Sequence, residues 1–178
     1  AHPHGVDLGP LQPRLPEVLR TPSERIEAAP PEIVADVRRL TALLDDGEDG
    51  SLVLVGRRDL RSNNSWIHNV EVLVKGKERC TLHIHPDDAA PLRLTNGELC
   101  VVSSRVGQLE VPVELTEDIA PGVVSLPHGW GHNQPGTRLA VANERAGVNS
   151  NLLTDEDDVE AITGTAVLSG IPVEVARA

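Results

Sequence analysis

The chain has 178 residues and a formal net charge of −11 at neutral pH. This length suffices for one domain with its own core and an extension, and the negative charge argues against nucleic acid as a partner, because phosphate backbones are bound by basic surfaces. Phe and Tyr are absent, so the core must be built from Val, Leu, Ile and Ala, and the two aromatic residues are Trp66 and Trp130.

Membrane and secretory signals are also absent from the sequence. No apolar run approaches the roughly 20 residues of a membrane span, and no charged-then-apolar signal segment opens the chain. Cys80 and Cys100 lie in apolar runs and are expected to be buried free thiols, so we expect a reducing, cytoplasmic location. The chain starts at Ala1 and has no Met, which indicates a processed chain or a piece of a longer one.

The first 50 residues are expected to form a connector rather than part of the main domain. Seven prolines within residues 1–31 predict an extended arm. Residues 31–44 are predicted to form an amphipathic helix, because apolar residues recur at helical spacing from Ile33 to Leu44. The acidic, glycine-bearing residues 45–50 are the expected boundary, so we divide the chain into residues 1–50 and a main domain, 51–178.

The main domain is predicted to be mainly β. Residues 108–115 alternate between apolar and polar side chains, as a half-buried strand does, and residues 86–92 are expected to form one short helix beginning with Pro86. Several short strands with one small helix favour a closed six-stranded β-barrel over an open sheet. The predicted strands are 51–56, 80–84, 98–103, 108–115, 123–126 and 171–176.

Two polar segments follow predicted strands and are the candidate functional loops. In residues 56–69 three arginines, several asparagines, Trp66 and His68 follow a strand that ends at Gly56. The arginine guanidinium can bind phosphate or a flat heterocycle, and the asparagine amide can donate to and accept from the edge of a heterocycle. Residues 126–133 carry His128, Trp130 and His132 in a long loop. A positive pocket in an acidic protein favours a small anionic ligand, and the alternative for both segments is an ordinary hydrogen-bonded or solvated loop.

A metal site is a second interpretation of the histidines. His83 and His85 form an H-x-H pair, and Pro127 to His132 matches P-x-G-x-x-H. Together the two motifs resemble those of the cupin family, in which histidines and a glutamate hold one metal in a small barrel. The alternative function is therefore a cupin-type metal protein that uses His83, His85 and His132.

A longer resemblance accounts for more of the chain. Four blocks stand in the same order as in the C-terminal domain of molybdopterin oxidoreductases of the dimethyl sulfoxide reductase superfamily, and the pattern is most similar to formate dehydrogenase-like subunits. The blocks span residues 51–176: Gly56–Asn69, His85–Gly107, Asp118–Trp130, and Asn149–Thr154 with the closing strand Ile171–Val175.

The resemblance implies a double-psi β-barrel that closes over a molybdenum or tungsten bis(molybdopterin guanine dinucleotide) cofactor. It implies that the first loop contacts pterin and phosphate groups, that the 128–132 loop lies near the pterins, and that the asparagine of the fourth block binds a pterin. The implied cofactor-binding residues are Gly56, Arg57, Arg58, Arg61, Asn63, Asn64, Trp66, His68, His128, Trp130, His132, Asn149 and Asn151. Arg57→Ala is accordingly expected to lower cofactor retention far more than barrel stability.

The resemblance also implies that this chain is not catalytic by itself. Two cysteines cannot supply the four thiolates of an iron–sulfur cluster, and no side chain can be assigned as the molybdenum ligand. Both belong to the remaining domains of the complete enzyme, which are the expected partners of this chain. Ser169 and Gly170 stand where some relatives place a basic residue near the cofactor.

Overall fold

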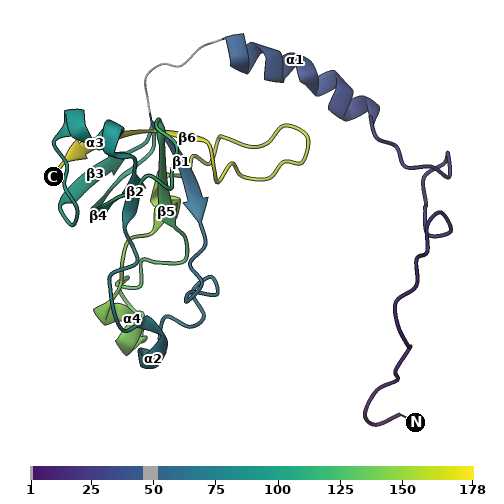
Figure 1. Cartoon of the computed structure of the whole chain (residues 1–178), viewed down its shortest axis with the longest axis horizontal. Helices are drawn as coiled ribbons and strands as arrows, with labels where there is room; N and C mark the ends of the chain where they lie inside the picture. The colour runs from purple at the N-terminus through teal and green to yellow at the C-terminus, as the bar shows by residue number, and fades with distance from the viewer. Residues whose placement is uncertain (1, 46–51) are drawn as a thin grey trace. The chain divides into compact units, whose positions relative to one another are not determined.

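The computed structural model describes residues 2–45 and 52–178. It divides the chain into two compact units, Ala1–Gly47 and Glu48–Ala178; the boundary expected at residue 50 lies outside the described residues. In the first unit an irregular segment leads into one helix, α1 (Pro31–Asp45) (Figure 1). This confirms the predicted helix. Its apolar residues Ile33, Val37 and Leu40 are exposed.

The second unit is a closed barrel of six short strands (Figure 1). Around the barrel the strands follow the order β1-β5-β2-β4-β3-β6, so sequence neighbours are mostly not spatial neighbours. This confirms the mainly β, six-stranded barrel expected from the sequence. The strands are β1 (Leu52–Arg57), β2 (Leu82–Ile84), β3 (Leu99–Ser103), β4 (Gln108–Leu115), β5 (Val123–Pro127) and β6 (Ile171–Arg177).

Alternating side chains fill the barrel interior. In β4, Leu109, Val111 and Val113 point inward, and their neighbours on the strand are more exposed. Such period-two burial is what a strand with one core face requires. The other strands contribute aliphatic residues of similar size, so a core without Phe or Tyr is filled by Leu, Ile and Val.

The short helices occur in the segments that connect the strands along the chain. The predicted helix is present as α3 (Pro86–Leu92), where the His85 side chain caps the first turn by accepting from the Asp87 backbone N–H. Three short elements were not expected from the sequence: α2 (Glu71–Val74), α4 (Ala140–Glu144) and the 3-10 turn η1 (Ser150–Leu153). Each is at most five residues long, too short for a helical periodicity to be visible. No helix within residues 2–45 or 52–178 is long and apolar enough to cross a bilayer.

The pairing of β1 with β5 positions the polar loops. The two strands run parallel, with Arg57 beside Pro127 in the register. Parallel strands end at the same edge of a sheet, so the loops that begin at residues 58 and 128 leave the barrel at the same end.

Candidate functional site

The two polar loops are in direct contact. Gly129, with φ +87°, lies so close to the Asn64 backbone that a Cβ atom at residue 129 would overlap the Asn64 carbonyl group. Only glycine combines this conformation with this approach. The side chains are also in contact, because His128 Nε2 lies 3.1 Å from Asn64 Oδ1. Two loops whose contacting residues are separated by 64 positions in the sequence therefore form one surface.

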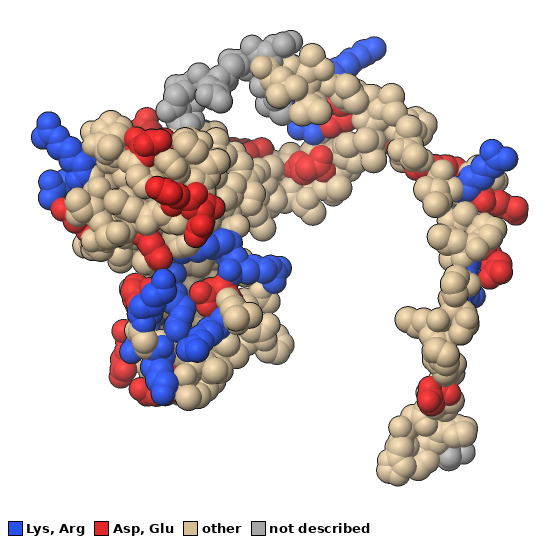
Figure 2. Space-filling view, in the orientation of Figure 1, with Lys and Arg blue, Asp and Glu red and all other residues tan. Residues whose placement is uncertain are grey.

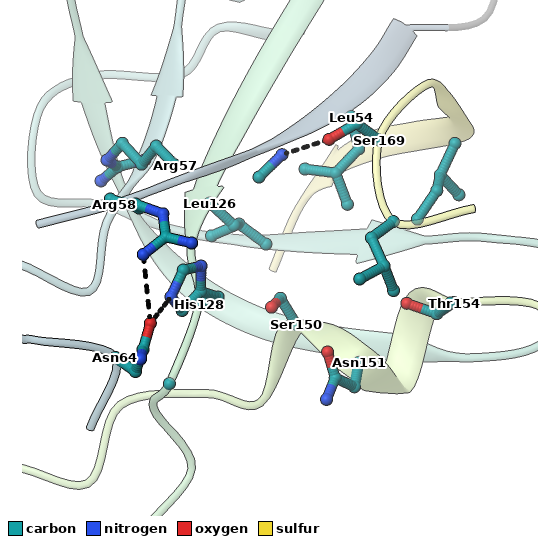
Figure 3. A pocket seen from close by; sticks show the side chains of 14 residues that line it. Leu54, Arg57, Arg58, Asn64, Leu126, His128, Ser150, Asn151, Thr154 and Ser169 are labelled. Atoms are coloured by element: carbon teal, nitrogen blue, oxygen red, sulfur yellow. Dashed lines mark hydrogen bonds between the residues drawn. The ribbon is translucent and has the colours of Figure 1, made fainter. Parts of the chain in front are cut away.

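A pocket of about 480 Å³ opens beside this contact (Figure 3). Its apolar part comes from Leu54, Leu126, Leu168 and Ile171, and its polar part comes from the two loops and from η1. An apolar floor with a few convergent polar groups is the usual composition of a small-molecule site. The polar lining residues are Arg57, Arg58, Asn64, His128, Ser150, Asn151, Thr154 and Ser169, with Gly56 and Gly129 between them.

Arg58 is the arginine whose charged group faces this pocket. Its side chain is exposed, and Nη1 lies 3.4 Å from Asn64 Oδ1, the same oxygen that His128 approaches (Figure 3). Asn64 Oδ1 thus accepts from both side chains, which leaves the other guanidinium N–H groups of Arg58 for an anionic ligand.

Arg57 has a different role, although it lines the same pocket. Its guanidinium is half-buried and donates to backbone carbonyls of neighbouring strands and loops, at 2.5 Å to Ser125 and 2.7 Å to Thr81. A further bond joins it to the Thr81 hydroxyl. Burial lowers the pKa of Arg57, and the nearby Glu114 opposes this shift. Its donors therefore hold the barrel end together, and its expected contact with a cofactor stays a prediction.

Three rings of the expected site pack against one another, outside the pocket lining. His68 is 1% exposed and stacks on Trp130 with ring centroids 4.0 Å apart, and its Nδ1 lies 2.7 Å from His132 Nε2. Burial, and then the neighbouring His132, lower the pKa of His68; burial also lowers the pKa of His132. Both rings are consequently neutral at neutral pH. Trp130 Nε1 has no hydrogen-bond partner among the described residues.

The remaining expected residues lie outside the pocket lining. Asn149 caps η1 by accepting from the Asn151 N–H, and it packs against Gly131. Arg61, Asn63 and Trp66 are exposed on the first loop, where Trp66 has 81% of its surface accessible. Of the thirteen residues, the pocket collects Gly56, Arg57, Arg58, Asn64, His128 and Asn151.

Several lining residues were not singled out from the sequence. Ser150 and Thr154 flank Asn151 in the block that carries the family resemblance, so that block could have indicated them. Ser169 was noted only as standing where some relatives place a basic residue, and it accepts from the Gly56 N–H at 3.3 Å, across 113 positions of sequence. No local pattern in the sequence marks that contact.

The metal interpretation of the histidines is wrong. His83 lies 3.5 Å from Glu114, His85 caps α3, and His132 contacts His68, so the three side chains have separate partners. Among the described residues no group of three or more His, Cys, Asp or Glu side chains could hold a metal ion. The three histidines therefore do not form one set of metal ligands, although β2 and β5, which carry parts of the two motifs, are paired strands.

Positive side chains gather on the part of the barrel unit that carries the loops (Figure 2). The exposed cations of residues 57–79 are Arg58, Arg61, Lys75 and Lys77, and Arg138 is exposed in the second loop, within a chain whose net charge is −11. A local positive region in an acidic protein attracts small anions.

Both cysteines are buried free thiols, as expected. Burial raises the pKa of Cys80 and of Cys100 to about 11. Since the thiolate is the reactive form, the native chain should incorporate less than about one tenth of the iodoacetamide that it takes up in urea at pH 8. Mass spectrometry of the intact chain measures this, and rapid double labelling of the native protein would contradict it.

Several known proteins are similar to this chain. A family model described as "Molydopterin dinucleotide binding domain" matches residues 52–172. The molybdopterin-containing subunit of arsenate respiratory reductase from Chrysiogenes arsenatis is 30% identical over 121 residues, which are 65% of this chain and 14% of that protein. One subunit of tetrathionate reductase from Salmonella typhimurium is 27% identical over 111 residues, 53% of this chain and 11% of that protein.

Two further proteins are also similar. The alpha subunit of F420-dependent formate dehydrogenase from Methanocaldococcus jannaschii is 46% identical over 46 residues, 26% of this chain and 7% of that protein. The solved structure of acetylene hydratase from Pelobacter acetylenicus shares the fold, with a TM-score of 0.61 and 21% identity over 82% of this chain and 20% of that one. The chain thus spans 14% or less of the curated relatives described here.

Proposed function

Because this chain belongs to the Molydopterin dinucleotide binding domain family, we propose that its pocket binds part of a molybdopterin guanine dinucleotide within a larger oxidoreductase. The convergence of Arg58, Asn64 and His128 over an apolar floor is the observation that carries the proposal. The donor set fits the group. A guanidinium suits the anionic phosphates, and side-chain amides suit the edges of flat heterocycles.

Each part of the pocket has a role in this proposal. Arg58 binds an anionic group, Asn64 and Asn151 hydrogen-bond a heterocycle, and the leucines of the floor exclude water. When bound, the cofactor supplies two-electron redox chemistry at molybdenum or tungsten, and this domain supplies binding, orientation and electrostatics. The metal ligand and any iron–sulfur cluster come from the remaining domains, the proposed partners of this chain.

The proposed substrate class is small oxyanions. Formate is the substrate that the sequence resemblance favours, and one relative is a formate dehydrogenase over a short match. The arsenate and tetrathionate reductases, which match longer segments, act on other oxyanions. Turnover of formate, nitrate, arsenate and tetrathionate by the complete enzyme, each assayed with a redox dye, selects among them.

Arg58→Gln tests the proposed function. In the complete enzyme the change should lower the pterin content roughly tenfold after dialysis, which corresponds to about 1.4 kcal/mol, the lower end of the strength of a charge-assisted hydrogen bond. Pterin released by acid is quantified by fluorescence against protein concentration.

Arg93→Gln is the matched control for Arg58→Gln. Arg93 is an exposed arginine at the C-terminal end of α3 and does not line the pocket. Its replacement should leave the pterin content at the wild-type level. Equal pterin content in Arg58→Gln and Arg93→Gln would overturn the proposed function.

A further inference from the structure

A chain of hydrogen bonds runs from the second loop into the backbone of the first. His132 Nε2 lies 2.7 Å from His68 Nδ1, His68 Nε2 lies 2.6 Å from Ser62 Oγ, and Ser62 Oγ lies 2.5 Å from the Asn64 carbonyl oxygen. Ser62 and His68 are 2% and 1% exposed, so the bond between them is shielded from water, and the two outer bonds are part-buried. We call Ser62, His68 and His132 the loop clasp.

At neutral pH the hydrogen bonds of the loop clasp all donate in one direction, from His132 toward the Asn64 carbonyl. A carbonyl oxygen only accepts, so the Ser62 hydroxyl donates to Asn64 and must itself accept from His68 Nε2–H. A neutral imidazole with its proton on Nε2 has a bare Nδ1. This nitrogen accepts from His132 Nε2–H. Each of the two rings therefore has a defined tautomer.

The clasp ends on the residue that presents its amide to the pocket. Asn64 has φ +64°, a left-handed conformation that asparagine adopts more readily than most residues. Its carbonyl accepts from Ser62, and its side-chain oxygen accepts from Arg58 and His128. Because the bond from Ser62 fixes the Asn64 backbone, it also constrains the direction of the Asn64 side chain, so the clasp acts on the pocket through Asn64.

We propose that the loop clasp is a pH-dependent positioning device that holds the Asn64 amide in its ligand-binding orientation and releases it on acidification. The proposal rests on the proposed function of the pocket. A proton on His68 Nδ1 reverses the bond to His132, whose Nε2 must then accept. When both rings are charged, two N–H donors face one another and the bond between the loops is lost.

Few charged groups surround the clasp. Asp59 from the first loop favours the charged form of His68, whereas Arg79 and His132 oppose it, and burial opposes it most. At His132 burial also opposes the charge, and the Gly129 carbonyl favours it. The folded-state pKa values of both rings thus lie below the ordinary 6.5.

The sign of the pH effect follows from these shifts. Because the unfolded loops take up protons at a higher pH than the folded ones, the stability contributed by the clasp is complete above about pH 6.5. It is lost as the pH falls through the folded-state pKa values. Cofactor binding should weaken over the same range.

The test uses three variants and two readouts. Amide hydrogen exchange of residues 62–68 is measured in the full chain, and pterin content is measured in the complete enzyme, both between pH 8 and pH 5. His132→Gln keeps an amide that can donate to His68 or, after a flip, accept from it. His132→Leu keeps neither function, and His85→Asn replaces a histidine outside the clasp with a residue that can still cap α3.

The expected results separate the variants by their pH profiles. In the wild type and in His85→Asn, the protection of residues 62–68, taken relative to the intrinsic exchange rate at each pH, should fall roughly tenfold, the effect of one hydrogen bond, as the pH falls from 7 through the folded-state pKa values of the two rings. Pterin content should fall over the same interval. His132→Gln should flatten both profiles near the neutral wild-type level, and His132→Leu should show fast exchange and low pterin content at every pH.

Two results would overturn the inference. One is an identical pH profile in the wild type and His132→Gln, and the other is wild-type exchange in His132→Leu. Ser62→Ala removes the donor to Asn64 without touching a histidine, so it keeps the test decisive if His132→Leu does not fold. If Arg58→Gln loses pterin but no clasp variant does, the proposed function stands and the clasp is rejected. If Arg58→Gln retains its pterin, the proposed function is rejected, and the hydrogen-exchange profiles still decide whether the clasp exists.

Discussion

Replacing Gly129 with alanine should separate the two polar loops and destabilise the chain by about 4 kcal/mol. About 1–2 kcal/mol of this comes from placing a Cβ at φ +87°. A further ~1–3 kcal/mol comes from overlap with the Asn64 carbonyl, whose carbon would lie 2.7 Å from the new methyl group. Urea unfolding of the full chain measures the loss, and the complete enzyme should lose its pterin.

Gly136→Ala is the control that isolates the steric overlap. Gly136 has nearly the same φ, +88°, but a Cβ there meets nothing within 4 Å. It should cost about 1 kcal/mol, because the backbone strain is partly offset by the lower entropy of the unfolded chain. If both alanine variants lost the same stability, the close approach of Gly129 to Asn64 would not matter to the fold.

Arg57→Ala should destabilise the chain by about 3 kcal/mol. The guanidinium donates to the carbonyls of Ser125 and Thr81, two buried residues, and each buried acceptor left without a donor costs ~1–3 kcal/mol. The sequence leads us to expect a loss of cofactor retention as well, and measuring the pterin content of the complete enzyme beside the stability compares the two effects. The measurement is the urea concentration at the midpoint of unfolding, compared at an equal m value, the dependence of the unfolding free energy on urea concentration.

Arg58→Ala is the matched variant for Arg57→Ala. The two arginines are adjacent in sequence, but the Arg58 side chain is exposed and its hydrogen bond is to the exposed Asn64. Its loss should change stability by no more than about 0.5 kcal/mol. Equal destabilisation by the two variants would contradict the division of roles between Arg57 and Arg58.

Sequence patterns were informative wherever local chemistry decides the structure. The alternation in residues 108–115 identified β4, and Pro86 with two following acids identified α3. These signals are strong because burial of one strand face and the chemistry of a helix start act over a few neighbouring residues. The helices α2 and α4 were missed because four or five residues do not show a helical period.

The candidate site was only partly predictable. Arg58, Asn64 and His128, which the family resemblance implies as cofactor-binding residues, line one pocket, because they belong to loops that leave the barrel at one end. Arg57 was expected beside them in the same role. Its donors instead face backbone carbonyls of Ser125 and Thr81, contacts that no spacing in the sequence reveals.

The family, the six-stranded barrel and the two loops that carry the polar residues could all be recognised before folding was considered. They follow from composition, periodicity and motif order, which are properties of neighbouring residues along the chain. Which of the polar residues line the pocket, cap a helix or pack outside the pocket lining became evident only in the folded chain. The parallel pairing of β1 with β5 is the cause, because it brings Asn64 against Gly129 and His68 against His132 through contacts between residues more than sixty positions apart.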